Sequence, residues 1–107
     1  MTRLPRGAHA RSFSESEDGF RDAVRSLAEW AGWVVYYVPD SRWTDTRGWP
    51  DLVLARGGRV LFRELKTDIG RVSKEQVWWI EQLTAAGADA KVWRPADWPE
   101  IERTLKG

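Results

Sequence analysis

Apolar residues recur every three or four positions between residues 17 and 31, and this spacing predicts an amphipathic helix. Phe20 and Leu27 lie on its apolar side. Ser14 or Ser16 can cap the start of the helix, because a serine oxygen accepts N–H groups that the first turn leaves free. We therefore expect a helix ahead of the first strand.

β-Branched and aromatic residues mark three strands in the next part of the chain. A polar loop, residues 39–50, separates the first strand from the second, and loops of this length are usually functional or mobile. Gly57 and Gly58 stand between the second and third strands, which favours a tight hairpin. The three predicted strands are residues 33–38 (WVVYYV), 51–55 (DLVLA) and 60–66 (VLFRELK).

The C-terminal part predicts a second helix, a fourth strand and a short last helix. The second helix begins at Ser73, where Ser73 and Gln76 have the spacing of a capping box. The fourth strand is residues 90–94, and Asp97 is expected to cap the last helix. The buried side of the second helix is expected to carry Val77, Ile80 and Leu83.

This order of elements predicts an α/β fold, with a mixed, mainly antiparallel four-stranded sheet flanked by helices. A length of 107 residues fits one domain, which we place at residues 15–107. Residues 1–14 carry three arginines and one histidine but no acidic residue. We interpret them as a flexible basic arm, and a disordered tail without a function is the alternative.

Composition limits the chemistry. The formal net charge of +1 argues against a wholly basic binder, so contacts with nucleic acid would come from local patches. There is no cysteine, and His9 is the one histidine, so a metal would be held by oxygen ligands, as Mg²⁺ and Mn²⁺ are. No apolar run approaches the roughly 20 residues of a membrane span, and the N-terminus lacks the apolar segment of a signal peptide. We expect a cytoplasmic protein with no membrane partner.

The hairpin turn sets a register. If Gly57 and Gly58 form the turn, counting outward places Asp51 opposite Glu64. Glu64 and Lys66 share one face of their strand, because strand side chains alternate. The hairpin therefore gathers two carboxylates and an ammonium group at one end of the sheet. Because like charges destabilise a sheet when directly opposed, a cation between the carboxylates is expected.

This arrangement suits phosphodiester hydrolysis. Asp51 and Glu64 can hold Mg²⁺ or Mn²⁺, which polarises a phosphoryl oxygen and lowers the pKa of a bound water. Lys66 can orient that water or stabilise the developing negative charge. The alternative is that Glu64 and Lys66 are surface residues of an amphipathic strand. Against it, Val60 and Phe62 share their face, which should then be at least partly buried.

The segments GWPDLVL, RELK and SKEQVWWIEQL resemble the VRR-NUC branch (virus-type replication-repair nucleases) of the PD-(D/E)xK nuclease superfamily. The resemblance covers roughly residues 16–105. Asp51 matches the aspartate of the family's PD, and Glu64 and Lys66 match its E-x-K. The resemblance implies the restriction-endonuclease-like core of that superfamily, with Asp51, Glu64 and Leu65 as metal ligands.

The resemblance also implies two further catalytic residues. The family's glutamate in the first helix matches Glu17, with Glu15 as the competing choice, and its glutamine after the E-x-K strand matches Gln76. Both positions have a purely structural alternative. Ser14 with Glu17, and Ser73 with Gln76, have the spacing of capping boxes, in which the side chain only satisfies a helix start.

Arginines alternate with tryptophans in the loop before Asp51, a pattern that can grip phosphates and stack on exposed bases. The alternative is a loop pinned down by its own aromatic residues. Basic residues also flank the start of the second helix, where a helix N-terminus favours phosphate. The predicted DNA-binding residues are Arg42, Trp43, Arg47, Trp49, Arg71 and Lys74.

The expected function is therefore a Mg²⁺-dependent DNA endonuclease. The resemblance implies a structure-selective enzyme for branched or junction DNA in phage or bacterial replication or repair, acting as a homodimer. One of the adjacent residues Trp78 and Trp79 should point away from the core and could mark the dimer surface. The alternatives are a simple nicking or restriction-type nuclease, a non-catalytic DNA-binding module with this fold, and a protein-interaction subunit.

Overall fold

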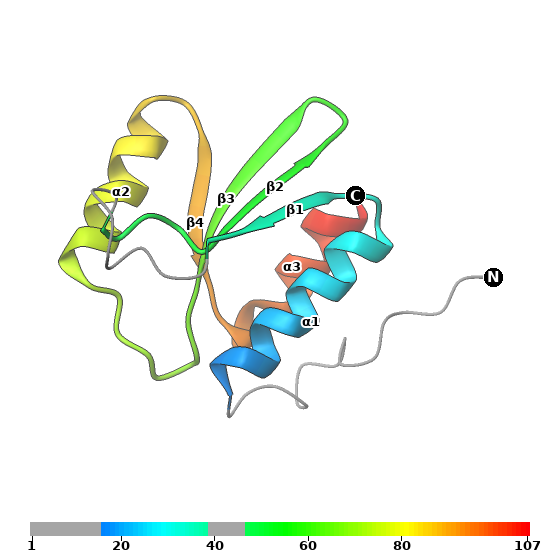
Figure 1. The fold of residues 1–107 in the computed structure, drawn as a ribbon, viewed down its shortest axis with the longest axis horizontal. Coiled ribbons are helices and arrows are strands. Elements are labelled where there is room, and N and C mark those ends of the chain that lie inside the picture. Colours follow the sequence, from blue (N-terminus) through cyan, green and yellow to red (C-terminus); the bar gives the residue numbers. More distant parts are fainter. Residues whose placement is uncertain (1–15, 39–46) are drawn as a thin grey trace.

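A computed structural model of the protein describes residues 16–38 and 47–107. Its elements follow one another in the predicted order, with a 3₁₀ turn added before the last helix (Figure 1). Within those residues, no helix is both long enough and apolar enough to cross a membrane. The elements are α1 (Glu17–Trp30), β1 (Val34–Tyr37), β2 (Leu52–Arg56), β3 (Arg59–Leu65), α2 (Lys74–Ala85), β4 (Asp89–Trp93), η3 (Pro95–Asp97) and α3 (Trp98–Lys106).

The four strands form one sheet in the order β1-β2-β3-β4. β1 pairs with β2 and β2 with β3 in antiparallel fashion, whereas β3 and β4 are parallel, so the predicted mixed sheet is confirmed. The predicted hairpin register is also confirmed, because Ala55 pairs with Val60 and Leu52 with Arg63. Gly57 has a positive φ of 55°, which suits glycine at the turn.

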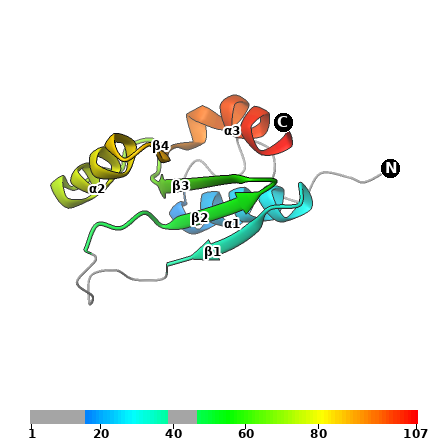
Figure 2. The same ribbon diagram turned by 90° about the horizontal axis from the view of Figure 1, so that it is seen from above.

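The hydrophobic core lies between one face of the sheet and the helices α1 and α3. These two helices contact each other and lie on the same side of the sheet (Figures 1 and 2). Side chains of β2 and β3 that alternate toward this face are buried, as strand geometry requires. The largest apolar side chains of the core are Phe20, Leu27, Trp33, Leu52, Leu54, Leu61, Leu65, Trp93, Trp98, Ile101 and Leu105.

The helix α2 stands apart from α1 and α3 and packs beside β4 (Figure 1). The expectation that α2 buries Val77, Ile80 and Leu83 is wrong: none of its residues is buried, and Val77 is 42% exposed. The reason is that α2 covers only the β4 side of the sheet. Its apolar side chains therefore find too few partners to be fully buried. For the same reason Val60, near the hairpin turn, is 47% exposed. The expected burial of that sheet face is therefore only partial.

The helix starts also differ from expectation in one case. Ser16 caps α1, and its Oγ accepts the main-chain N–H of Gly19 at 3.0 Å. Asp97 occupies the N-cap position of α3, but its side chain makes no cap hydrogen bond there. Its carboxylate instead accepts the main-chain N–H of Arg94 at 2.9 Å, so it closes the turn between β4 and α3.

Candidate active site

Asp51 lies where β2 begins, at the open end of the hairpin. The β2–β3 pairing ends with Leu52 opposite Arg63, and the same register continues with Asp51 opposite Glu64. Asp51 Oδ2 accepts the main-chain N–H of Leu65 at 2.9 Å. The carbonyl of Asp51 accepts the N–H of Val38 at 2.8 Å. Asp51 is thus held from both neighbouring strands, and its position is set by the sheet.

Glu64 is the buried carboxyl group of this site, with a relative exposure of 2%. Its Oε2 accepts a hydrogen bond from Gln76 Nε2 at 2.9 Å and lies 3.9 Å from Lys66 Nζ. Its Oε1 is also buried, and no donor among residues 16–38 and 47–107 bonds to it. A buried oxygen without a donor is costly, which indicates that a proton or a cation belongs there.

The electrostatic setting of Glu64 points the same way. Burial, followed by the charge of Asp51, raises the pKa of Glu64 from 4.5 to about 9. A hydrogen bond with Asp51 and the charge of Glu17 raise it further, whereas Lys66 lowers it. A hydrogen bond between two carboxyl groups requires a proton on one of them, because both are acceptors when ionised. Without a cation, Glu64 therefore keeps its proton well above the usual pKa of a glutamate.

Lys66 follows Glu64 at the end of β3, and its side chain is only 17% exposed. Its main-chain N–H donates to the carbonyl of Trp93 on β4 at 3.1 Å. The turn after Lys66 is held by Arg94, whose Nη1 donates to the carbonyls of Thr67 at 2.6 Å and Gly70 at 2.8 Å. The sequence carried no signal for this clamp, because the partners of Arg94 are main-chain oxygens far away in the chain.

The side chain of Gln76 takes part in a capping box and also contacts Glu64. Its side-chain Oε1 accepts the main-chain N–H of Ser73 at 2.8 Å, and its main-chain N–H donates to Ser73 Oγ at 3.1 Å. The capping box is therefore confirmed. Its Nε2 remains free for Glu64 and donates to it. Gln76 therefore joins the start of α2 to the buried carboxyl group.

Glu17 is the first residue of α1. Because Ser16 is the cap, Glu17 is not at the third position of a capping box with Ser14, and that alternative is wrong. The side chain of Glu17 is exposed, and its charge acts on Glu64 as an unfavourable neighbour. Glu15 lies outside the described residues. The first helix therefore brings one further carboxylate toward the pair.

The donors of this site fit a hard divalent cation held partly by water. In the described part of the chain, no three Asp, Glu, His or Cys side chains form a group that could hold a metal ion. Mg²⁺ does not require such a group, since it is usually bound through one or two carboxylates, substrate phosphates and several waters. Asp51 and Glu64 would be these carboxylates. Leu65 can offer only its main-chain carbonyl, because its side chain is apolar and buried.

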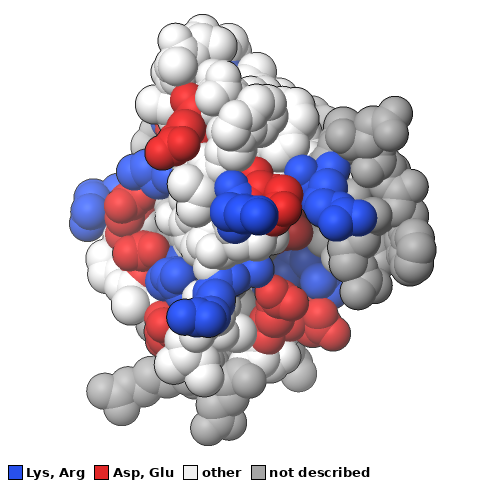
Figure 3. All heavy atoms as spheres, turned by 90° about the vertical axis from the view of Figure 1, so that its left-hand side faces the viewer, with Lys and Arg blue, Asp and Glu red and all other residues white. Residues whose placement is uncertain are grey.

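The predicted DNA-binding residues are only partly brought together. Arg42 and Trp43 lie outside the described residues. Arg47, Arg71 and Lys74 are exposed. Figure 3 looks onto the side that carries α2, where Lys and Arg side chains alternate with Asp and Glu. This side offers local basic patches rather than one basic face.

Trp49 is half-buried and packs against two other aromatic side chains. Its ring meets Phe62 and Trp79 edge-on, at centroid distances of 5.7 and 4.9 Å. Trp79 Nε1 also donates to the carbonyl of Arg47 at 3.0 Å. These contacts support the alternative of a loop pinned by its own aromatic residues for residues 47–50, and they leave Trp49 half-buried.

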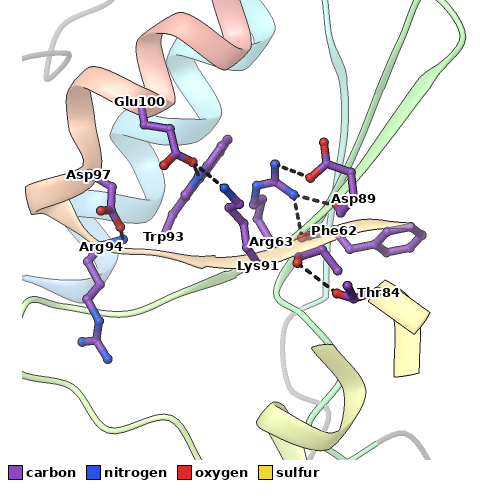
Figure 4. A network of polar contacts seen from close by, with 10 residues as sticks. Phe62, Arg63, Thr84, Asp89, Lys91, Trp93, Arg94, Asp97 and Glu100 are labelled. Carbon is purple, nitrogen blue, oxygen red and sulfur yellow. Dashed lines mark hydrogen bonds and ion pairs between the residues drawn. The ribbon is translucent and has the colours of Figure 1, made fainter. Parts of the chain in front are cut away.

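Arg63 is a buried residue whose importance the sequence did not reveal, although its place opposite Leu52 was predicted. Its Nη2 contacts Asp89 Oδ1 at 2.9 Å, and its Nη1 donates to the Asp89 carbonyl at 2.7 Å. Its guanidinium lies 4.5 Å from the centre of the Trp93 ring. Trp93 Nε1 in turn donates to Glu100 at 3.0 Å (Figure 4). This network ties β3, β4 and α3 together on the face opposite Glu64.

Comparisons with known proteins add no relative to this picture. No protein-family model, curated protein or solved structure matches the chain. The assignment of a function therefore depends on the site itself and on the sequence resemblance.

Proposed function

We propose that this protein is a metal-dependent nuclease that hydrolyses phosphodiester bonds of DNA. The observation that carries the proposal is the buried Glu64, which lies opposite Asp51, next to Lys66, and has one oxygen without a donor from the described residues. Burying a carboxyl group beside another acid is unfavourable, so its retention indicates a functional role. The resemblance of the PD and E-x-K segments to the VRR-NUC nucleases supports this reaction class.

Asp51 and Glu64 would hold Mg²⁺ or Mn²⁺, together with the Leu65 carbonyl that the resemblance implies. When bound, such an ion polarises the phosphoryl oxygen and makes an attacking water more acidic. Asp51 is kept in place by the N–H of Leu65. Gln76 keeps Glu64 Oε2 fixed through Nε2, which leaves Oε1 for the cation. One oxygen of each carboxylate is thus held by the protein.

Lys66 would act on the substrate. Its ammonium lies beside the carboxylate oxygen at 3.9 Å, and 17% of its side chain remains exposed, so it can meet a phosphate that approaches the site. There it would neutralise the charge that develops on the phosphate as the bond breaks. Glu17, at the start of α1, would act through a contact bridged by water or through a second metal ion.

The experiment that tests this proposal is a cleavage panel. The purified protein is incubated with Mg²⁺, Mn²⁺ or EDTA and with duplex, single-stranded, nicked, flap and four-way-junction DNA. We expect cleavage that requires the divalent ion and is strongest on one of the branched forms. Equal cleavage of plain duplex would favour the simple nicking or restriction-type alternative. Binding of DNA without cleavage of any form would favour the non-catalytic module.

A two-fold homodimer would allow paired cleavage of two strands, because one domain presents one such site. Trp78 on α2 is 52% exposed, as expected for the outward member of the Trp78–Trp79 pair, and it is our candidate for the contact. Light scattering at micromolar concentration should then report about twice the chain mass. A monomer that cuts both strands of a junction symmetrically would contradict this part of the proposal.

A further inference from the structure

The loop before Asp51 rests directly on the backbone of α2. Gly48 is buried and has a positive φ of 87°. A Cβ atom at Gly48 would lie 2.6 Å from the main-chain carbon of Glu75, which is closer than real Cβ contacts allow. Glycine is therefore needed here for two reasons, its backbone conformation and the close approach to the helix. The contact fixes how near the first turn of α2 comes to the loop that leads into Asp51.

The amide group of Gln76, one residue after Glu75, can point in only one way. Its oxygen faces the main-chain N–H of Ser73 and its nitrogen faces Glu64 Oε2. If the amide were rotated by half a turn, its NH₂ group would face the N–H of Ser73, donor against donor. Its oxygen would then face Glu64 Oε2, acceptor against acceptor. The N–H of Ser73 therefore selects the orientation in which Gln76 donates to Glu64.

Few other contacts would restore this geometry if the start of α2 moved. None of the residues of α2 is fully buried, so packing resists a small shift of the helix less than it would in the core. The bond from Trp79 Nε1 to the carbonyl of Arg47 connects the same helix to the same loop. The loop and the start of α2 thus behave as one unit, and the Gly48 contact sets their spacing.

We propose that Gly48 and Ser73 are positioning residues, which aim Gln76 Nε2 at Glu64 through main-chain contacts outside the candidate active site. This inference rests on the proposed nuclease function for its catalytic consequence, but the geometry can be tested without catalysis. If the side chain of Gln76 no longer points at Glu64, Oε2 loses its donor and the carboxylate becomes free to rotate. The cleavage step should then suffer more than the binding of DNA.

The first test uses Gly48→Ala with Gly87→Ala as its matched control. Gly87 has nearly the same φ, 91°, but no atom lies within 4 Å of a Cβ placed there, so the control carries the backbone strain without the contact. The side-chain NH₂ signals of Gln76 are followed by ¹⁵N NMR in the metal-free protein. In Gly48→Ala, we expect the proton that donates to Glu64 to lose its protection from exchange with water, whereas Gly87→Ala keeps it. Unchanged protection in a folded Gly48→Ala would overturn the role of Gly48.

The second test concerns Ser73 and remains informative if Gly48→Ala does not fold. The φ of Ser73 is −71°, which proline can adopt, so Ser73→Pro removes the N–H together with the hydroxyl at a compatible φ. Ser73→Ala removes only the hydroxyl. We expect the Gln76 NH₂ to lose protection in Ser73→Pro and to keep more of it in Ser73→Ala. Equal protection in both variants would overturn the role of the Ser73 N–H.

Cleavage assays then link the geometry to catalysis. Loss of one hydrogen bond to a charged group predicts a kcat about ten- to a hundredfold lower in Gly48→Ala and Ser73→Pro. KM for DNA should stay within about twofold, since no DNA contact is removed. A raised KM with an unchanged kcat would overturn the catalytic part of the inference. A parent protein that cleaves no DNA would refute the proposed function, and the NMR results would still decide the positioning.

Discussion

Asp51 lies opposite Glu64 at the open end of the β2–β3 hairpin, where its Oδ2 accepts the main-chain N–H of Leu65, the residue after Glu64. Burial and this acidic neighbour raise the pKa of Glu64 to about 9. At neutral pH Glu64 therefore keeps a proton that an isolated glutamate would have lost. The stability of the protein, its affinity for a cation and its chemistry should all depend on this proton.

The first prediction concerns stability and pH in the metal-free protein. A carboxyl group with a raised pKa binds its proton more tightly in the folded state, so its contribution is fully present below pH 4.5 and is lost as the pH rises toward about 9. Glu64→Gln has no such proton. Across this window, the free energy of unfolding of Glu64→Gln should therefore rise relative to that of the parent. The difference should be on the order of 1.4 kcal/mol per pKa unit, and several kcal/mol at most.

Urea unfolding in EDTA between pH 4 and pH 9 measures this difference. Glu81→Gln, which changes an exposed glutamate of α2, is the matched control and should follow the parent. Parallel pH profiles for the parent and Glu64→Gln would show that Glu64 keeps an ordinary pKa in the folded protein.

The second prediction concerns metal binding. Because a cation at Glu64 must displace the proton of that carboxyl group, binding of Mg²⁺ or Mn²⁺ should release about one proton below pH 9 and should strengthen with pH. Millimolar metal should also raise the melting temperature of the parent, since a ligand of the folded state stabilises it. Asp51→Asn should lose most of this shift, although its amide oxygen can still accept the N–H of Leu65.

Calorimetry in two buffers of different ionisation enthalpy counts the released protons, and thermal melts with and without Mn²⁺ give the shift. A melting temperature of the parent that does not respond to either ion would count against a metal at this pair.

The third prediction concerns DNA binding by the start of α2. Arg71 and Lys74 are exposed there, so Arg71→Ala and Lys74→Ala should each weaken binding of all DNA forms and lower the slope of log K against log salt by about one. Arg103→Ala on α3 is the control with the same loss of charge. Fluorescence anisotropy in Ca²⁺ between about 50 and 200 mM salt measures the slopes. Equal effects of all three variants would indicate a purely non-specific attraction.

The features that the sequence predicted best are those set by residues close together in the chain. Gly57 and Gly58 specify a tight turn, and the turn fixes the register that brings Asp51 to Glu64, so the centre of the site follows from counting residues. The capping box between Ser73 and Gln76 is equally local. Its second role at Glu64 depends on where α2 lies relative to the sheet, so spacing alone left both interpretations of Gln76 open.

Features set by tertiary packing were not predictable in this way. The apolar stripe of α2 predicted burial, but the helix meets only the β4 side of the sheet and buries none of its residues. Arg63 and Arg94 bind groups that are 24 to 27 residues away in the sequence. From the sequence, Trp49 could equally have been a stacking platform or a packing residue, and its edge-on contacts with Phe62 and Trp79 come from parts of the chain that local spacing does not bring together.

The most direct test of the central claim compares metal-dependent cleavage of DNA by the parent, Glu64→Gln and Lys66→Ala, with Glu81→Gln as the control. Loss of a ligand or of the charge beside the phosphate should lower kcat by about a hundredfold or more. Circular dichroism should show all four proteins folded. We expect cleavage by the parent and by Glu81→Gln with Mn²⁺, and almost none by Glu64→Gln or Lys66→Ala. Cleavage by a folded Glu64→Gln at the rate of the parent would contradict the assignment of this site.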